Sequence, residues 1–414
     1  METSIILPEH VIEDILLRLP VKHLLPWKSV SKYFYALIRD EHFAKKHYHF
    51  QYAMHLVDHG DVPLLLDTPS DHHVSAEFHL VSAHGGRDVI VNITPDFERD
   101  IPPVIVLEGE LYNQCMRCIG LVNGIVCLLW GRGRLALWNP ATREFKGVPR
   151  WPIMPDDKDA EKLSPSILGF GFDVQSNDFK ILGIIRTINR NALESDCIYE
   201  FHVYSLKANS WKMIKDIPRT YLAFDLAFTD SYFNNGVHYW PASELPYIPR
   251  NGIVSFNFSS ETFKEFEPPV AAVPVETRCR LKVGKYKEGL ALLVNRTSEN
   301  EETCFEIWAA TEFRDDNEVP SCWQLVVNVP PIYSYNTLNV CSIIGCGDLL
   351  LHICVHDDDD DDDDDDEEWG DVRFADSGAY LYNLSTRTFK YFGFRFNSSF
   401  RYVESLFPLS RRLL

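Results

Sequence analysis

The 414-residue sequence lacks any long apolar run, since none of its hydrophobic stretches approaches the ~20 residues that a membrane span needs. Its first four residues, Met1-Glu-Thr-Ser, contain an acid and no basic segment, which excludes a secretory signal peptide. We therefore expect the chain in the cytoplasm, or also in the nucleus, where thiols stay reduced. The ten cysteines are accordingly expected to be free thiols.

Basic residues are scarce: 40 Lys and Arg stand against 60 Asp and Glu, for a net charge of −20. Much of this charge lies in one run, Asp357 to Asp366 followed by Glu367 and Glu368, and without those twelve acids the net charge would be −8. Such a chain lacks the basic footprint of a protein that binds nucleic acid or an anionic membrane.

The acidic run itself predicts a disordered loop at residues 357–368, because ten equal neighbouring charges repel one another. It lacks the alternating ligands and the glycine of a calcium-binding loop. A functional alternative is that this loop engages a basic surface on a partner.

Sequence motifs of catalytic, cofactor-binding and metal-binding sites are also missing. The sequence has no nucleophile elbow, no phosphate-binding loop and no dinucleotide fingerprint in its proper context. Cys115-Met-Arg-Cys118 is a lone pair without the second pair that a zinc site requires. We therefore predict no catalytic residue, no metal site and no cofactor.

An amphipathic helix is indicated near the N-terminus. Between Pro8 and Leu19, the apolar residues Val11, Ile12, Ile15 and Leu16 follow a 3.6-residue period. Pro20 should end this helix, because the residue before a proline avoids the α region.

Two further helical patterns follow, through Leu24 and Leu37, and Pro26 should kink or shorten the first of them. Three short helices within residues 1–50 bury little surface alone. Such a module often completes its core against a partner, although it could instead be a cap on the chain's own β domain.

These helices resemble an F-box, through Leu7-Pro8, Ile15-Leu16, Leu19-Pro20-Val21-Lys22 and Val30-Ser31-Lys32. The resemblance implies that residues 1–50 bind a Skp-type adaptor, which links to a cullin. It assigns adaptor contact to Leu7, Pro8, Ile15, Leu16, Leu19, Pro20, Leu24, Val30, Lys32 and Leu37. Two positions depart from the family pattern: Phe34 replaces the usual Trp, and Pro26 replaces a basic residue.

Beyond residue 50 the sequence favours β structure. Aromatic residues make up 13% of the chain, and strands favour them. Asn123-Gly124 and Asn235-Gly236 are strong signals for type I′ hairpin turns, which need two positive φ angles.

A repeat of paired aromatic residues runs through this part. Four copies have the pair seven residues apart, and a fifth is stretched by an acidic insert; the pairs are Trp138/Phe145, Tyr204/Trp211, Phe256/Phe263, Tyr382/Phe389 and, stretched, Trp308/Trp323. The first members of successive pairs along the chain are 66, 52, 52 and 74 residues apart.

A period near 50 residues with several strands per unit is typical of a β-propeller. Five units are visible, and residues 52–106 could supply a sixth, so we predict about six blades. The overall expectation is a mainly β protein, with three F-box helices and a β-propeller-like domain at 51–410. The alternative is a β-sandwich with accidental similarity between its hairpins.

The same region resembles the F-box-associated interaction domain of plants, through the motifs GLVNGIVCL, LWNPATREFK, ILGFGFD and YVESLFPL. Within that family the pattern is closest to the S-locus F-box and S-locus-F-box-like branch. Members of this branch recognise S-RNases in pollen self-incompatibility, so the resemblance implies an S-RNase as one target.

Together these features predict a non-catalytic substrate receptor of an SCF-type (Skp–cullin–F-box) ubiquitin ligase, which binds a target protein for ubiquitination and proteasomal degradation. The alternatives are a scaffold outside the ligase, and a glycan-binding or enzymatic propeller with a helical cap. Loops on a rigid scaffold carry specificity. The loops expected to bind the target are residues 151–158, 186–196, 241–250 and the acidic run.

Overall fold

The structure is a computed structural model of the whole chain. It describes residues 7–59, 62–68, 77–84, 87–93, 116–130, 134–151, 163–187, 198–215, 231–245, 248–269, 272, 279–287, 289–297, 303–314, 319–332, 337–344, 348–354, 378–383, 386–391 and 398–409. The predicted acidic loop at 357–368 and Cys115 lie outside these residues.

The N-terminal part is helical, as predicted, but it contains more helix than the sequence indicated. The helices are α1 (Glu9–Leu17), α2 (Val21–Leu24), the 3₁₀ turn η1 (Leu25–Ser29), α3 (Lys32–Ile38) and α4 (Glu41–His59). The proline effects are confirmed: α1 ends before Pro20, and α2 is only one turn long because Pro26 lies at the start of the 3₁₀ turn that follows it.

The third predicted helix is in fact two helices. Ser31 caps α3, with its Oγ accepting from the Phe34 N–H at 3.2 Å. Asp40 then caps α4 by accepting from the Phe43 N–H at 2.8 Å. A second helix therefore starts after the two residues that follow α3, and α4 continues to His59.

The rest of the described chain forms six four-stranded sheets, which confirms a mainly β protein with propeller-type blades. Within each sheet, strands that follow one another in sequence pair antiparallel. The first two sheets contain β1 (Leu64–Thr68), β2 (Glu77–His84), β3 (Arg87–Asn92) and β24 (Ser398–Arg401), and then β4 (Arg117–Val122), β5 (Ile125–Trp130), β6 (Arg134–Asn139) and β7 (Glu144–Gly147).

The next two sheets contain β8 (Leu163–Asp173), β9 (Asp178–Thr187), β10 (Ile198–Ser205) and β11 (Ser210–Ile214), and then β12 (Tyr232–Asn234), β13 (Val237–Leu245), β14 (Ile248–Asn257) and β15 (Thr262–Phe266). The last two contain β16 (Cys279–Tyr286), β17 (Gly289–Thr297), β18 (Thr303–Arg314) and β19 (Val319–Ile332), and then β20 (Thr337–Ile344), β21 (Asp348–Cys354), β22 (Gly378–Asn383) and β23 (Thr388–Tyr391).

One sheet joins the two ends of the β region. Its strand order is β24-β1-β2-β3, so a strand from the C-terminus completes a sheet that begins at Leu64. The chain continues this pairing past the strand, where the Tyr402 N–H donates to the Pro63 carbonyl at 2.8 Å. The sequence indicated a sixth repeat unit here but not its C-terminal strand.

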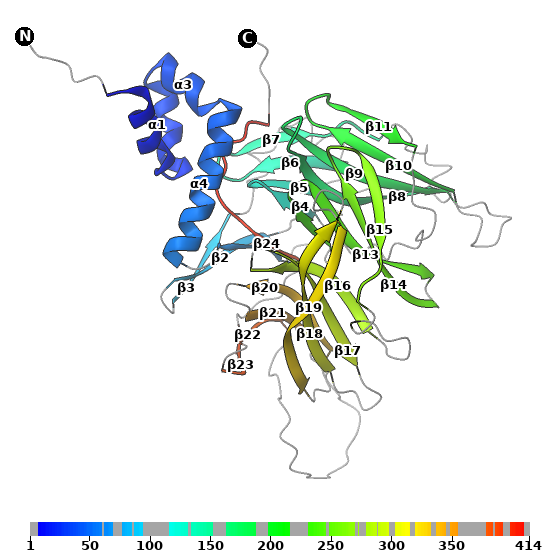
Figure 1. Cartoon of the computed structure of the whole chain (residues 1–414). Coiled ribbons are helices and arrows are strands. Elements are labelled where there is room, and N and C mark those ends of the chain that lie inside the picture. The colour runs from blue at the N-terminus through cyan, green and yellow to red at the C-terminus, as the bar shows by residue number, and fades with distance from the viewer. Residues whose placement is uncertain are drawn as a thin grey trace, which may run out of the picture. The chain divides into compact units, whose positions relative to one another are not determined.

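The chain divides into two compact units. The first consists of residues 1–150 and 400–414, and it holds the helices and the sheets that contain β1 and β4. In this unit the C-terminal residues, drawn in red, pass beside the helices (Figure 1). The second unit consists of residues 151–399 and holds the other four sheets.

All five predicted aromatic pairs lie on hairpins, and in four of them the two residues are directly opposed. The opposed pairs are Trp138/Phe145, Tyr204/Trp211, Phe256/Phe263 and Tyr382/Phe389, with ring centroids 5.8, 5.5, 4.7 and 4.7 Å apart. Directly opposed residues share one face of a sheet, so each pair packs as a cross-strand unit. Phe172 and Phe179 form a similar opposed pair, which was not among the five predicted pairs.

In the stretched fifth pair the two residues lie on one hairpin but are not directly opposed. Trp323 lies opposite Ala310, and Trp308 lies opposite Leu325. The β18–β19 pairing contains several register shifts, and each extra residue in a strand displaces its opposed partners. Trp308 and Trp323 nevertheless both pack against the same buried cluster.

Both Asn-Gly turns are confirmed. Asn123 and Gly124 have φ angles of 49° and 75°, and Asn235 and Gly236 have 47° and 87°. Two successive positive φ values match the twist of the flanking strands, which sets the register of β4–β5 and of β12–β13.

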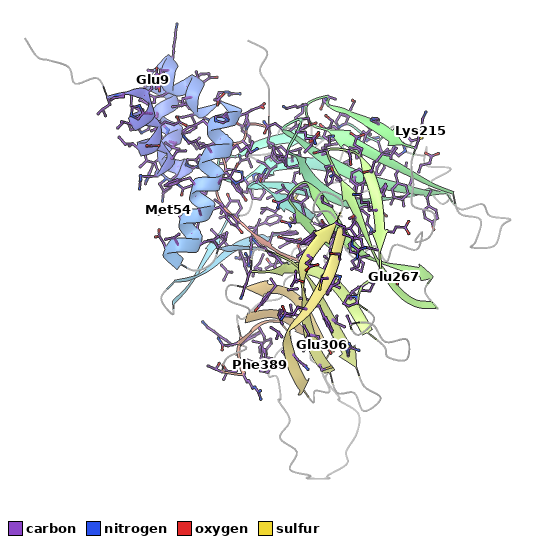
Figure 2. All side chains as sticks on the ribbon, viewed as in Figure 1. Glu9, Met54, Lys215, Glu267, Glu306 and Phe389 are labelled. Carbon is purple, nitrogen blue, oxygen red and sulfur yellow. The ribbon has the colours of Figure 1, made fainter. Side chains whose placement is uncertain are left out.

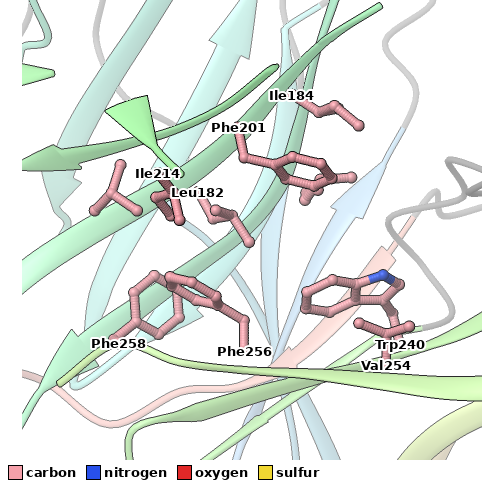
Figure 3. Packing of buried hydrophobic residues seen from close by; sticks show 10 residues of the cluster. Leu182, Ile184, Phe201, Ile214, Trp240, Val254, Phe256 and Phe258 are labelled. Atoms are coloured by element: carbon pink, nitrogen blue, oxygen red, sulfur yellow. The ribbon is translucent and has the colours of Figure 1, made fainter. Parts of the chain in front are cut away.

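The hydrophobic core lies between neighbouring sheets. One cluster joins Leu182 and Phe201 of the β8–β11 sheet to Trp240 and Phe256 of the β12–β15 sheet, whose side chains face one another in Figure 3. Other clusters likewise combine residues from two successive sheets. A single hairpin cannot bury its aromatic face, so stacking of successive sheets supplies the core that the repeat requires.

No helix among the described residues has both the length and the apolar character that crossing a membrane would demand.

Candidate functional site

The N-terminal helices have a small apolar interior. It is formed by fully or nearly fully buried side chains from all four helices, namely Leu16, Leu17, Val21, Leu24, Ile38, Phe43, Ala44 and Tyr48. Figure 2 shows these helices with Glu9 at the start of α1 and Met54 near the end of α4. This interior is buried within the same unit, whose C-terminal residues also contact Val21.

The same helices also expose large apolar side chains. Those between residues 7 and 35 are Leu7, Ile15, Trp27, Val30, Tyr33 and Tyr35, with exposed fractions of 45, 46, 36, 68, 41 and 44%. We call this set the helical apolar surface. Exposed apolar side chains on one small module are candidates for contact with a protein partner, and aromatic residues are enriched at the centres of protein interfaces.

The predicted adaptor-binding residues divide by burial. Leu7, Pro8, Ile15, Pro20, Val30 and Lys32 are exposed, Leu19 and Leu37 are partly buried, and Leu16 and Leu24 are buried. The exposed members are available for direct contact. The buried ones could support an adaptor only from inside, by holding the helices in place.

Three aromatic residues of this surface were missed in the sequence: Trp27, Tyr33 and Tyr35. The ring of Phe34, which stands where the family usually has Trp, packs edge-on against Trp27 with centroids 4.9 Å apart. The signal was an unbroken aromatic run, Tyr33-Phe34-Tyr35, on a helix that can bury only one face.

Polar side chains of α4 hold the end of α1. His47 Nε2 donates to the Leu19 carbonyl at 2.8 Å, and Gln51 Nε2 donates to the Leu17 carbonyl at 2.7 Å. These contacts satisfy carbonyls that the helix itself leaves open. Burial lowers the pKa of His47, and its backbone hydrogen bond opposes this shift only in part, so the ring is neutral at pH 7.

A C-terminal segment is part of the same unit. Residues Tyr402–Leu409, which we call the C-terminal strap, are mostly buried. Glu404 Oε2 accepts from the Val21 N–H at 3.0 Å, and Asn139 Nδ2 donates to the carbonyls of Ser405 and Phe407 at 2.9 and 3.1 Å. The strap thus contacts both the helices and the β4–β7 sheet.

Within the described part of the chain, no three His, Cys, Asp or Glu side chains gather as metal ligands would. Cys118 is buried, and burial, followed by the nearby Asp67 carboxylate, raises its pKa well above the ordinary value. Burial has the same effect on Cys127. Thiols in such surroundings stay protonated and make poor nucleophiles or metal ligands.

Most of the predicted target-binding loops lie outside the described residues. Trp151 is an exception: it is buried and stacks on Trp211 with ring centroids 4.6 Å apart, so it is a core residue. The segment 241–250 was expected to be a loop but is mostly strand, because β13 continues to Leu245 and β14 begins at Ile248. Pro241 is tolerated there as a strand residue paired with Ile253.

Two family models match the chain. One is described as an F-box domain and matches residues 5–46. The other is described as an F-box associated beta propeller domain and matches residues 89–409. The first covers the helical apolar surface, and the second covers all but one of the six sheets in full.

Several F-box proteins of Arabidopsis thaliana are similar to this chain in sequence. The F-box protein CPR1 is 25% identical over 336 residues, covering 78% of this chain and 73% of its own. The F-box/kelch-repeat protein At3g23880 is 25% identical over 266 residues, covering 64% of this chain and 66% of its own. A solved structure of the Cps50 (Swd1) beta-propeller domain from Myceliophteria thermophila is 7% identical with a TM-score of 0.30, covering 67% of this chain and 85% of its own.

Proposed function

Since the chain belongs to the F-box-associated β-propeller family, we propose that it serves as the substrate-recognition subunit of an SCF-type ubiquitin ligase. The helices would bind a Skp-type adaptor and, through it, a cullin. The sheets would bind a target protein destined for ubiquitination and proteasomal degradation. The observation that carries this proposal is the helical apolar surface, a set of exposed apolar side chains on the helices that the F-box model matches.

The exposed residues suit a protein partner. Removing apolar surface from water stabilises a complex by roughly 25 cal/mol per Å², so several half-exposed side chains can supply useful affinity. Val30 is the most exposed member of the surface, at 68%, and the exposed Lys32 is two residues further along the chain. An apolar centre with a charged rim is the usual composition of such an interface.

The proposed role needs no catalytic residue in this chain. Binding a target and a ubiquitin-carrying enzyme to one assembly raises the effective concentration of the target's lysines near the ubiquitin. The buried, protonated state of Cys118 and Cys127 agrees with a binding role for the chain.

An S-RNase is one target class to test, on the strength of motifs such as GLVNGIVCL and YVESLFPL that resemble the S-locus branch. We propose that the acidic run at 357–368 would attract such a target if it is basic. Binding of a basic S-RNase at low salt should weaken when residues 357–368 are deleted. Unchanged affinity would remove the acidic run from the proposal.

Purification of the full chain with a Skp-type adaptor and a cullin tests the main proposal. We expect the three proteins to elute together as a stable complex. If the folded full chain binds no adaptor, the ligase role is wrong, and a scaffold role outside the ligase would replace it.

A further inference from the structure

The C-terminal strap is enclosed by its own unit. Of its residues, Tyr402, Val403, Ser405, Leu406, Phe407 and Leu409 are buried. Glu404 is only partly buried, and its side chain points to the helices through the hydrogen bond to Val21. A chain terminus usually frays unless other elements hold it. This segment is held by hydrogen bonds from the β4–β7 sheet on one side and from the helices on the other.

The β4–β7 sheet holds one side of the strap. The Asn139 side chain is fully buried, and its amide donates to two strap carbonyls while its Oδ1 accepts from the N–H groups of Ala141 and Thr142. Both N–H donors and both lone pairs of this amide are thereby used. Glu144 Oε2 also accepts from the Leu409 N–H at 2.9 Å, which ties down the far end of the strap.

The helices hold the other side. Val21 is the first residue of α2, and its N–H has no partner inside that helix. The preceding residue, Pro20, has no side-chain acceptor and makes no capping bond. Glu404 supplies the missing acceptor at 3.0 Å. Because the acceptor is a carboxylate, this is a stronger bond than one between neutral groups.

Two weaker relationships support the same arrangement. The carboxylate of Glu144 acts on Lys28 in η1, where it opposes the lowering of the Lys28 pKa by burial. Burial, and then the neighbouring Glu404 and Tyr48, raises the pKa of Tyr402, so the strap tyrosine lies near α4. Strap and sheet therefore face the helices at more than one place.

We propose that Glu404 is a positioning residue for ubiquitin transfer, which through its bond to Val21 holds the F-box helices in one orientation on the sheets of their own unit. The proposal rests on the proposed ligase function. A bound adaptor would then have a defined direction relative to these sheets. Transfer would fall on a defined set of lysines, because proximity catalysis depends on orientation.

The first test needs neither adaptor nor target. Hydrogen exchange of the amides in Val21–Leu24 is measured on the full chain as wild type, Glu404→Ala, Glu404→Gln and Glu267→Ala. We expect about tenfold faster exchange in Glu404→Ala, the loss of one charge-assisted hydrogen bond. Gln retains a carbonyl acceptor and should restore most of the protection. Glu267 is exposed and serves as the matched control.

The second test measures how the helices are oriented on the sheets of their own unit. Ubiquitin transfer to the chain's own lysines is followed in the complex with adaptor and cullin, and the modified lysines are identified by mass spectrometry. In Glu404→Ala we expect the adaptor Kd to stay within about twofold, because Glu404 lies outside the helical apolar surface. The modified lysines should spread to new positions, and Glu404→Gln should return the wild-type set.

The outcomes separate the two proposals. Unchanged exchange in Glu404→Ala overturns the positioning role, and so does faster exchange with an unchanged set of modified lysines. If the wild-type chain binds no adaptor and supports no transfer, the ligase function fails and the positioning role for transfer fails with it. The exchange result would then still show whether Glu404 holds the helices.

Discussion

The N–H of Val21 donates to a carboxylate oxygen of Glu404 at 3.0 Å, although 383 residues separate the two in the chain. The turn Leu19-Pro20-Val21-Lys22 was prominent in the sequence because of its family resemblance. The structure shows which group satisfies the first N–H of the helix that follows this turn. A proline before α2 leaves the first helical N–H open, and the end of the chain supplies its acceptor.

Replacing Gly124 by alanine should destabilise the protein more than the same change at Gly236. Both glycines have positive φ, which costs an alanine about 1 kcal/mol. At Gly124 a Cβ would also lie 2.5 Å from Ser405 Cβ and from the Val403 carbonyl oxygen. We therefore expect a loss of about 3 kcal/mol for Gly124→Ala in urea unfolding.

Gly236→Ala is the matched control, because its nearest contact to a Cβ would be 3.6 Å. Its loss should stay near 1 kcal/mol. Equal losses of unfolding free energy for the two variants would show that the strap does not contact the Asn123-Gly124 turn closely enough to exclude a Cβ.

A buried lysine and an exposed lysine bind the same glutamate and should differ in their contribution to stability. Lys180 Nζ lies 3.0 Å from both Asp173 Oδ2 and Glu261 Oε1, and its side chain is 9% exposed. Lys180→Met would leave the nearly buried Asp173 without its cation, and should cost about 3–5 kcal/mol in the free energy of unfolding.

The exposed partner provides the control. Lys212 Nζ lies 2.8 Å from Glu261 Oε2, but its side chain is 73% exposed. Lys212→Met should therefore cost no more than ~1 kcal/mol. Similar losses for the two lysines, measured by chemical unfolding at pH 7, would contradict the structural role of the buried cluster.

The buried ring of His238 should make stability fall in mildly acidic solution. Burial lowers its pKa from 6.5 to about 4, so the folded state binds fewer protons than the unfolded state between these values. Its contribution is complete above pH 6.5 and is lost as the pH falls toward 4. The loss should be on the order of 3 kcal/mol.

His238→Gln isolates this effect, because glutamine stays neutral throughout the range. The difference in unfolding free energy between wild type and variant should change with pH between 6.5 and 4. A constant difference across this range would show that His238 is protonated as easily in the folded protein as in the unfolded one.

The sequence predicted the features that depend on local chemistry. Pro26 breaks α2 whatever surrounds it, because it lacks an N–H and crowds the preceding turn. Phe256 and Phe263 pair because a tight turn between two strands places residues seven apart opposite each other. Trp308 and Trp323 are not directly opposed because several register shifts displace the partners in the long β18–β19 hairpin, and bulges leave no signature in residue spacing.

Features that depend on distant parts of the chain could not be predicted in this way. Ile15 and Leu16 belong to one apolar stripe, yet Ile15 is 46% exposed and Leu16 is buried. Which of them faces the core depends on where α4 packs. Likewise, nothing near Glu404 in the sequence indicates that its acceptor serves Val21.

The affinity of the chain for a Skp-type adaptor, compared between Val30→Asp and Val57→Asp by calorimetry, tests the central claim most directly. Both valines are highly exposed, at 68% and 78%, but only Val30 belongs to the helical apolar surface. We expect Val30→Asp to weaken adaptor binding at least about tenfold, by placing a charge in an apolar interface. Val57→Asp should bind as wild type does. If both variants keep the wild-type affinity, the helical apolar surface is not the adaptor interface.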